Sequence, residues 1–530
     1  MSHPVFDGLI TGFTVGSWVE SRRIFDRLSR LLGSLSIVIT VSSGAIAETI
    51  AETITPANDG TGTIVTPQDA NTVTITGGQL SGDGGNLFQS FQDFGLTANQ
   101  TAIFQTSPAI NNVLGRVVGG NVSIIDGELS IAGSQADLYL INPAGVVFGQ
   151  NASLNVPGDF MVTSADAIGF GEGLASAWWS ATSTGSTWAN WANLNGDPSG
   201  FAFRLAEPGV ILNSGTLTIE PGQHFSAIGG AIANTGTIAA PAGSVTALAV
   251  PGERLVRLSI PGNVLSLDVV PIVSPPTNLS LAETLPQLLT GNPDLQTASQ
   301  LTVNADGSVS LLGSDLGVTI DPGTVLLSGT IDVANDMTVE FGTTQQVTVL
   351  GEKIAVLDAT IDASGMVGGG TVLVGGEFQG NGTLPNANVL YVDERSQINA
   401  SASGRGDGGT AILWADGVTI ADGTIAARGE NGGFVEVSGK RALSFDGAID
   451  VSGTSGVNGT VLFDPEDLTL GGDESDEPPI DDFDEPPIDD FDDFDDPPID
   501  DFDDFDDFDE PPIDDFDEPP IDDLTICDSH

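Results

Sequence analysis

Cysteine and histidine are scarce in this chain of 530 residues. It contains one cysteine, Cys527, and three histidines, His3, His224 and His530. A single cysteine excludes an internal disulfide and a cysteine-based zinc site, and three histidines leave little for zinc or triad chemistry. Metal-dependent and triad enzymes are therefore disfavoured, and we predict no catalytic, cofactor or metal site.

Positive charge is also in short supply. Only 14 Lys and Arg residues stand against 73 Asp and Glu, which gives a formal net charge of −59. Such a chain repels phosphate backbones, so we exclude nucleic acid as a partner. Met (4) and Tyr (2) are rare whereas Gly (68) is abundant, which favours a turn-dense all-β protein.

The first 47 residues have the pattern of a signal peptide. A basic segment, 22–30, precedes an uncharged run of apolar and small residues, 31–47, that ends in Ala45-Ile46-Ala47. A charged region, an apolar region and an Ala-x-Ala site predict export, with cleavage between Ala47 and Glu48. A membrane anchor is the alternative, but the run is short for spanning and contains several serines.

Short apolar runs alternate with Gly, Asn, Asp and Ser turns from residue 48 to about residue 472, which is typical of β-strands. Repeats indicate how these strands are arranged. Residues 213–219 (NSGTLTI) recur 21 residues later as 234–240 (NTGTIAA). A period near 20 residues matches three short strands and three turns, which is one coil of a parallel β-helix.

A second set of repeats supports the same architecture. Its members begin at Ile361, Ile398, Ile425 and Ile449, and each is followed by a Gly-rich turn and an apolar run that begins at Thr371, Thr410, Phe434 and Thr460, respectively. Stacked coils would bury these apolar residues in one continuous core. A β-sandwich is the competing architecture, but sandwiches do not repeat at this period with matching turns. We predict an all-β, single-stranded parallel β-helix of the pectin-lyase-like type, with a cap at each end.

The composition changes abruptly after Gly472. Residues 473–530 contain 29 Asp and Glu, no Lys or Arg, and five copies of PPIDD. Mutual repulsion prevents such a segment from burying a core, so we expect a disordered acidic tail. Two roles are open for it: a solvated spacer, or weak capture of Ca²⁺ by many carboxylates without a defined site.

The sequence Asn142-Pro143-Ala144-Gly145 predicts a type I turn between two apolar runs. Asn suits the first position of such a turn, Pro has the φ of the second, and Gly suits the fourth. On these properties alone, the turn would be one more corner of a coil.

Four segments around this turn resemble the N-terminal secretion domain of filamentous haemagglutinin-like proteins, the exoproteins of two-partner secretion. They are residues 85–91 (GNLFQSF), 110–120 (INNVLGRVVGG), 125–127 (IDG) and 138–154 (LYLINPAGVVFGQNASL). The sequence looks most like the cyanobacterial members. Residues 432–440 and 459–465 are similar to the distal repeats of these proteins. The motif residues carried over are Asn142, Pro143, Gly145, Val146, Phe148 and Gly149; Ala144 and Val146 stand where the family usually has Asn and Ile.

The resemblance implies a capped, right-handed parallel β-helix that reaches the periplasm by the Sec route. It also implies a partner, an outer-membrane β-barrel transporter with POTRA domains, which passes the unfolded chain to the outside. We therefore expect a signal peptide at 1–47, a secretion domain at 48–269, a β-helical shaft at 270–472 and the acidic tail at 473–530. The expected role is that of a secreted or surface-exposed adhesin, with a carbohydrate or another surface ligand.

Two further functions stay open at this point. One is a polysaccharide-acting β-helix enzyme, which would need clustered carboxylates, and no such cluster is visible in the sequence. The other is a calcium-responsive structural surface protein without catalytic activity. Two local features are interpreted as structural or accidental: the tryptophans of segment 172–200 are expected to pack an extra hairpin against the coils, and Arg405-Gly406-Asp407 is a chance tripeptide in a Gly-rich turn.

Overall fold

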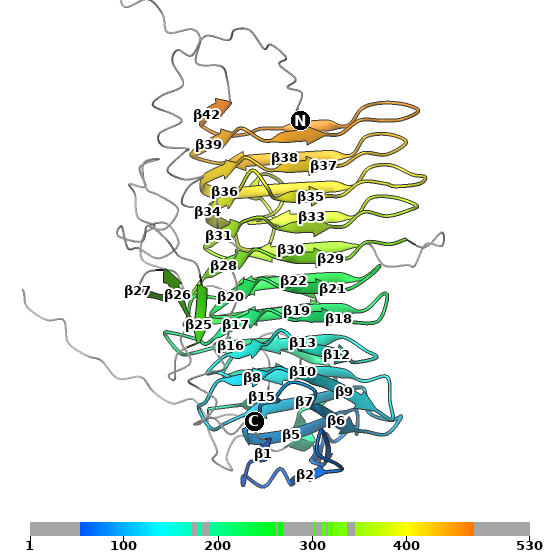
Figure 1. Cartoon of the computed structure of the whole chain (residues 1–530), viewed down its shortest axis with the longest axis vertical. Coiled ribbons are helices and arrows are strands. Elements are labelled where there is room, and N and C mark those ends of the chain that lie inside the picture. Colours follow the sequence, from blue (N-terminus) through cyan, green and yellow to red (C-terminus); the bar gives the residue numbers. More distant parts are fainter. Residues whose placement is uncertain are drawn as a thin grey trace, which may run out of the picture. The chain divides into compact units, whose positions relative to one another are not determined.

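The strands and turns fold into a stack of coils (Figure 1). This computed structural model describes residues 54–171, 177–182, 191–260, 263–268, 300–303, 309–313, 316–319, 321–336 and 345–470; for 257–268, 300–319, 469 and 470 it describes the backbone alone. The predicted signal peptide, its Ala47–Glu48 cleavage site and the acidic tail lie outside these residues. In the described part, no helix is long and apolar enough to cross a membrane.

Three ladders of parallel strands form the three faces of the solenoid. Face 1 contains β5 (Asn86–Asp93), β7 (Asn112–Val117), β10 (Asp137–Ile141), β13 (Phe160–Thr163), β19 (His224–Gly229), β22 (Ser244–Ala249), β30 (Gln346–Leu350), β33 (Thr371–Val374), β36 (Thr410–Ala421), β38 (Phe434–Gly439) and β41 (Thr460–Leu462).

Face 2 contains β8 (Ser123–Ile125), β11 (Val146–Phe148), β17 (Val210–Asn213), β20 (Ala231–Asn234), β28 (Thr324–Leu327), β31 (Lys353–Val356), β34 (Ala387–Val392), the second half of β36, β39 (Ala442–Phe445) and β42 (Asp467–Leu470). Strand β36 runs from face 1 into face 2 without interruption. Its first half pairs with β38 of face 1, and its second half pairs with β39 of face 2.

Face 3 consists of two runs. The first contains β3 (Thr72–Gly77), β6 (Thr101–Gln105), β9 (Glu128–Ala132) and β12 (Ser153–Asn155), and the second contains β18 (Thr216–Thr218), β21 (Thr237–Ala239), β29 (Thr330–Asp332), β32 (Thr360–Asp362), β35 (Gln397–Asn399), β37 (Thr424–Ala426) and β40 (Ala448–Asp450). These parallel ladders confirm the predicted β-helix.

Both sets of sequence repeats occupy equivalent places in successive coils. Asn213 pairs with Asn234, and the Nδ2 of Asn213 donates to the Oδ1 of Asn234 at 2.9 Å. The four isoleucines of the second set stack in register along face 3. In three of the four repeats the next residue, Asp362, Asn399 or Asp450, accepts the N–H of the serine two positions on, so the turn chemistry repeats with the coil.

One apolar core runs through the stack. Inward side chains from all three faces, among them Ile75, Val146, Ile238, Val347 and Val435, are buried and belong to a single cluster. Strand β22 of the predicted secretion domain pairs directly with β30 of the predicted shaft. The coils therefore continue across the expected boundary near residue 269, and the placing of that boundary stays a prediction.

Antiparallel strands occur in three groups beside the parallel ladders. At its first coil, β1 (Thr55–Pro56) and β4 (Gln79–Leu80) pair with β5, and β2 (Thr63–Pro67) pairs with β3; the predicted cap remains an expectation. A side sheet has the order β15 (Ala177–Ser180), β14 (Ala167–Phe170), β16 (Pro198–Phe203), β23 (Arg254–Ile260) and β24 (Asn263–Asp268). A third sheet holds β25 (Gln300–Val303), β26 (Val309–Gly313) and β27 (Leu316–Thr319), and two short 3-10 helices are η1 (Trp191–Asn193) and η2 (Phe378–Gly380).

The tryptophans behave as the sequence predicts where they can be seen. Trp179 lies in β15 and is fully buried, with its ring 5.0 Å from that of Phe88 on face 1. The side sheet is thus packed against the solenoid by an edge-to-face aromatic contact. Trp178 and Trp191 are half-buried, and Trp188 lies outside the described residues.

Candidate functional site

The predicted turn at residues 142–145 connects β10 of face 1 to β11 of face 2. The carbonyl of Asn142 accepts the N–H of Gly145 at 2.9 Å, which closes a four-residue turn. Ala144 is absent from the residues with positive φ, so the turn is not type II and fits the predicted type I geometry.

The side chain of Asn142 is fully buried, and both its amide nitrogen and its amide oxygen form hydrogen bonds. Its Nδ2 donates to the carbonyl of Asn121 and to Oγ of Ser123, both at 2.9 Å, and its Oδ1 accepts the N–H of Ala144 at 3.0 Å. Its own backbone N–H donates to Thr163 in the next coil at 3.0 Å. This one residue therefore ties its turn to the preceding and the following coil.

Gly145 is required by close packing as well as by its φ of 109°. A Cβ on Gly145 would lie 2.6 Å from the carbonyl oxygen of Val210, and a Cβ on Gly209 would lie 2.3 Å from the nitrogen of Gly145. Gly209 also donates its N–H to the carbonyl of Pro143 at 3.0 Å. The backbones of two consecutive coils thus touch at this corner, which only glycine permits.

The residues after the turn enter the two sides of face 2. Val146 and Phe148 point into the core, whereas Val147 lies in a separate apolar cluster. Phe148 packs edge-to-face on Phe160, with ring centroids 6.1 Å apart. A Cβ on Gly149 would lie 2.2 Å from the carboxylate of Asp126. The structure therefore brings all six motif residues together, in a corner that locks coils and carries no reactive side chain.

A family model agrees with the segments that carry the resemblance. Residues 51–272 match the model described as the TPS secretion domain. The chain contains the secretion domain of a two-partner secretion exoprotein. Exoproteins with this domain are secreted across the outer membrane, to the cell surface, by a dedicated outer-membrane transporter. The cyanobacterial affiliation stays a prediction.

Two solved structures are similar to this exoprotein. The secretion domain of HMW1 from Haemophilus influenzae has 19% sequence identity and a TM-score of 0.39, and the match covers 79% of this chain and 99% of that one. The filamentous hemagglutinin secretion domain has 12% identity and a TM-score of 0.31, with coverage of 79% and 99%. No curated protein matches the exoprotein.

The structure reveals a buried ion pair in the secretion domain, which sequence reasoning missed. Arg116 of β7 forms an ion pair with Asp59 (2.8 Å), and both side chains are almost fully buried, with 5% and 3% of their surface exposed. Its guanidinium also lies 4.8 Å from the ring centroid of Trp179 and bonds to the carbonyl of Ser180. A lone cation in the apolar run 112–118 is the signal that could have predicted a buried partner.

Carboxylates that are distant in the sequence meet at one corner of the coils. Asp137 accepts the N–H of Asp159 at 2.8 Å, Asp159 accepts the N–H of His224 at 2.8 Å, and Nδ1 of His224 contacts Oγ of Ser244 at 2.6 Å. Burial raises the pKa of Asp137 to about 7, and the charges of Asp159 and Asp197 act in the same direction. The hydrogen bond from the Asp159 N–H lowers the pKa but does not offset these effects. Burial also raises the pKa of Asp159, although His224 opposes this.

This corner corrects the impression that the sequence contains no carboxylate cluster. The sequence hides it because Asp159 and His224 are separated by the side-sheet excursion. The described residues nevertheless contain no group of three or more His, Cys, Asp or Glu side chains placed to hold a metal ion. One oxygen of Asp137 and one of Asp159 already hold a backbone N–H of the next coil, so the pair has a structural role in the stack.

Asp137 should make the protein less stable as the pH rises. Because its pKa is about 7 when folded and about 4 when unfolded, the folded state holds a proton that the unfolded state releases between these values. The free energy of unfolding should therefore fall from pH 4 to pH 7, by at most about 1.4 kcal/mol per pH unit from this group. We expect Asp137→Asn, measured by urea unfolding, to flatten this slope and to be more stable than wild type at pH 8.

The matched control for that measurement is Glu220→Gln, which removes one negative charge from an exposed position. It should leave the slope of stability against pH unchanged. An Asp137→Asn variant with the slope of wild type would show that Asp137 ionises normally in the folded protein.

The tripeptide Arg405-Gly406-Asp407 lies in a turn between β35 and β36. The Oδ1 of Asp407 accepts the Nδ2 of Asn431 in the next coil at 2.7 Å, and Gly406 has a φ of 97°. These contacts give the aspartate and the glycine ordinary structural roles, in keeping with the interpretation of the tripeptide as accidental.

Proposed function

We propose that the exoprotein crosses the outer membrane through a β-barrel transporter with periplasmic POTRA domains, and that it acts as an adhesin outside the cell. Within this function, the turn at Asn142 would close the secretion domain once the chain has emerged. The observation that carries the proposal is the complete burial of the Asn142 side chain between two coils. Such a residue gains its partners only when successive coils stack, so folding at this corner can favour outward movement.

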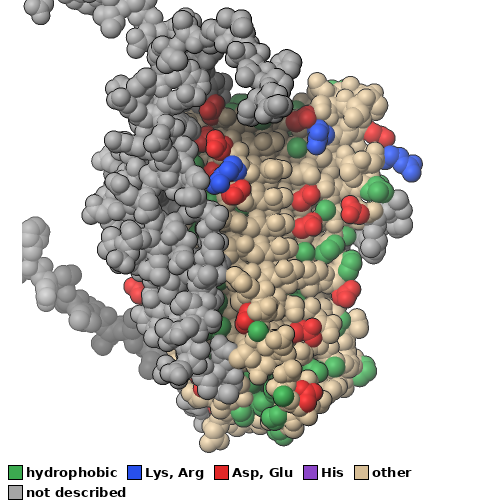
Figure 2. All heavy atoms as spheres, viewed as in Figure 1, with side chains coloured by type: hydrophobic (Ala, Val, Ile, Leu, Met, Phe, Trp, Pro, Cys, Tyr) green, Lys and Arg blue, Asp and Glu red, His purple; other side chains and the backbone are tan. Residues whose placement is uncertain are grey.

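A binding role is favoured over catalysis by the surface of the shaft. On the face shown in Figure 2, acidic side chains are dispersed among uncharged ones, and the few Lys and Arg side chains lie toward the C-terminal coils. In the secretion domain, the Asp137–Asp159 pair is engaged in coil-to-coil hydrogen bonds. A long ladder of parallel strands offers instead an extended surface for contact with a partner.

The export experiment uses a host with and without the candidate transporter. We compare wild type with Asn142→Ala plus Pro143→Ala and measure the chain in the culture medium and in the periplasm. Release should require the transporter and should fall at least tenfold in the double variant. A matched control, Asn155→Ala plus Pro157→Ala, changes the same residue types at the corner between β12 and β13, where Asn155 is exposed, and should be released like wild type.

Release of wild type without the transporter would contradict two-partner export of this chain. Equal release of the two double variants would instead show that the Asn142 turn has no specific role in export. The adhesive role is tested separately with beads coated with the released chain, which should attach to cell surfaces more than uncoated beads do.

A further inference from the structure

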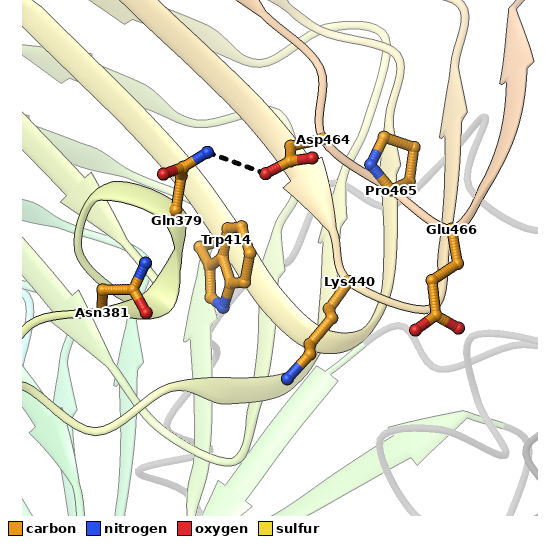
Figure 3. Close-up of a pocket in the computed structure, with 7 residues that line it drawn as sticks. All are labelled: Gln379, Asn381, Trp414, Lys440, Asp464, Pro465 and Glu466. Carbon is orange, nitrogen blue, oxygen red and sulfur yellow. Dashed lines mark hydrogen bonds between the residues drawn. The ribbon is translucent and has the colours of Figure 1, made fainter.

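An open pocket of about 340 Å³ lies on the C-terminal coils, outside the segment that matches the secretion domain (Figure 3). It is formed by segments that are far apart in the sequence: the flap 375–386 that follows β33, the strand β36, the turn between β38 and β39, and the turn between β41 and β42. Its lining residues are Gln379, Asn381, Trp414, Lys440, Asp464, Pro465 and Glu466.

The flap is held over β36 and β38 by close packing. A Cβ on Gly380 would lie 2.5 Å from Nε1 of Trp414, and one on Gly376 would lie 2.9 Å from the same indole. Trp414 is consequently only 3% exposed and lies beneath the pocket as an apolar support. The glycines thus allow the flap backbone to rest directly on the indole.

A buried carboxylate fixes the conformation of the flap. Glu436 of β38 is fully buried, and its two oxygens accept the N–H of Gln379 at 3.2 and 3.1 Å. Its neighbours in register, Ile412 and Leu462, are apolar, so an apolar residue would suit this position in a purely structural coil. Burial raises the pKa of Glu436, and the charge of Asp464 adds to this effect. The hydrogen bonds from Gln379 and Ser438 lower the pKa, but the net shift is upward.

The residue that Glu436 holds is strained. Gln379 has a φ of 52° and a ψ of 24°, in the left-handed region that non-glycine residues seldom adopt. Glycine would adopt this conformation without strain, and the same turn has one at Gly380. Position 379 instead carries a glutamine, whose Nε2 donates to Oδ2 of Asp464 at 2.9 Å. Figure 3 shows this bond across the rim of the pocket. Backbone strain and a buried carboxylate together place one carboxamide at the pocket, which is typical of a binding site.

The lining determines the chemistry of a ligand. Two carboxamides provide both donors and acceptors, Asp464 and Glu466 provide acceptors, and Lys440 provides donors. None of the ion pairs found among the described residues involves Lys440. One ammonium against two carboxylates disfavours an acidic ligand, and the dense polar lining disfavours an apolar one. The volume is at the low end for ligand pockets, which suits a single ring rather than an extended drug-sized molecule.

We propose that this pocket binds one neutral or amine-bearing sugar unit of a surface polysaccharide, with the hydroxyl groups held by Gln379, Asn381, Lys440 and Asp464. The inference rests on the proposed adhesive function and names its ligand class. Because the pocket is open to the surface, the sugar can be part of a longer chain that continues beyond it.

The test is a microarray of neutral, amino and acidic glycans probed with the purified full-length exoprotein. Binding should be confined to neutral and amino glycans. Lys440→Ala and Asp464→Asn should each reduce the affinity for the bound glycans at least tenfold. The matched controls, Arg405→Ala and Glu430→Gln, change exposed residues of neighbouring turns and should bind like wild type.

Three results would overturn the proposal: no glycan bound, acidic glycans bound alone, or affinities that the two pocket variants leave unchanged. Circular dichroism of each variant shows that the fold is retained. A blank array while coated beads still attach to cells would reject the sugar pocket alone, whereas loss of both would reject the adhesive function.

Discussion

Replacing Asn142 by alanine is expected to lower the free energy of unfolding by about 3 kcal/mol. The substitution removes both donors of the side-chain amide and its acceptor, and leaves the buried Oγ of Ser123 and the N–H of Ala144 without this partner. Each buried polar group that loses its partner costs about 1–3 kcal/mol. The measurement is urea unfolding of the purified chain at pH 7, followed by circular dichroism.

Asn155→Ala is the matched control for this prediction. Asn155 is exposed and has a single side-chain bond, from its Nδ2 to Oγ of Ser130 at 3.0 Å. Water can replace that bond, so the loss should stay below about 1 kcal/mol. Similar losses in the two variants would mean that burial at the Asn142 corner contributes nothing beyond an ordinary surface bond.

The coils could be predicted from the sequence because each repeat contains its own folding signals. An inward Ile, an Asp or Asn that caps the turn and a Gly-rich bend recur together, as at Ile361 and Ile449, and the structure stacks them in register. The turn at Asn142 could likewise be predicted from the sequence, because Asn, Pro and Gly have local backbone preferences that do not depend on distant residues.

The contacts between coils could not be predicted in the same way. Glu436 illustrates the reason: in the alternating run 434–437 it is expected to face solvent, yet it is fully buried. The residues that bury it belong to the flap, and Gln379 is 57 residues away in the sequence. The length of each insertion decides which side chains meet across coils, and these lengths vary without a period, so the pocket and the Asp137 corner appear only in three dimensions.

The largest effect is expected from breaking the ion pair between Arg116 and Asp59. Both side chains are buried, and Asp59 belongs to the segment between β1 and β2, Arg116 to face 1, and the nearby Trp179 to the side sheet. Arg116→Met keeps much of the volume but leaves a buried carboxylate without its cation, which should cost about 3–5 kcal/mol. Arg428→Met is the matched control, because its ion pair with Asp450 is exposed and spans 3.8 Å, and it should cost less than about 1 kcal/mol.

The pH dependence of wild type and variant identifies the mechanism of that loss. Burial alone would raise the pKa of Asp59, but hydrogen bonds from Ser90, Thr61 and Arg116 outweigh it and lower the pKa to about 2. The pair therefore stabilises the folded state above pH 4, and this contribution disappears as the pH falls from about 4 to about 2. Arg116→Met should weaken this acid dependence, and adding Asp59→Asn should recover part of the lost stability at pH 7. If the second change lowers the stability further, the pair is not the source of the effect.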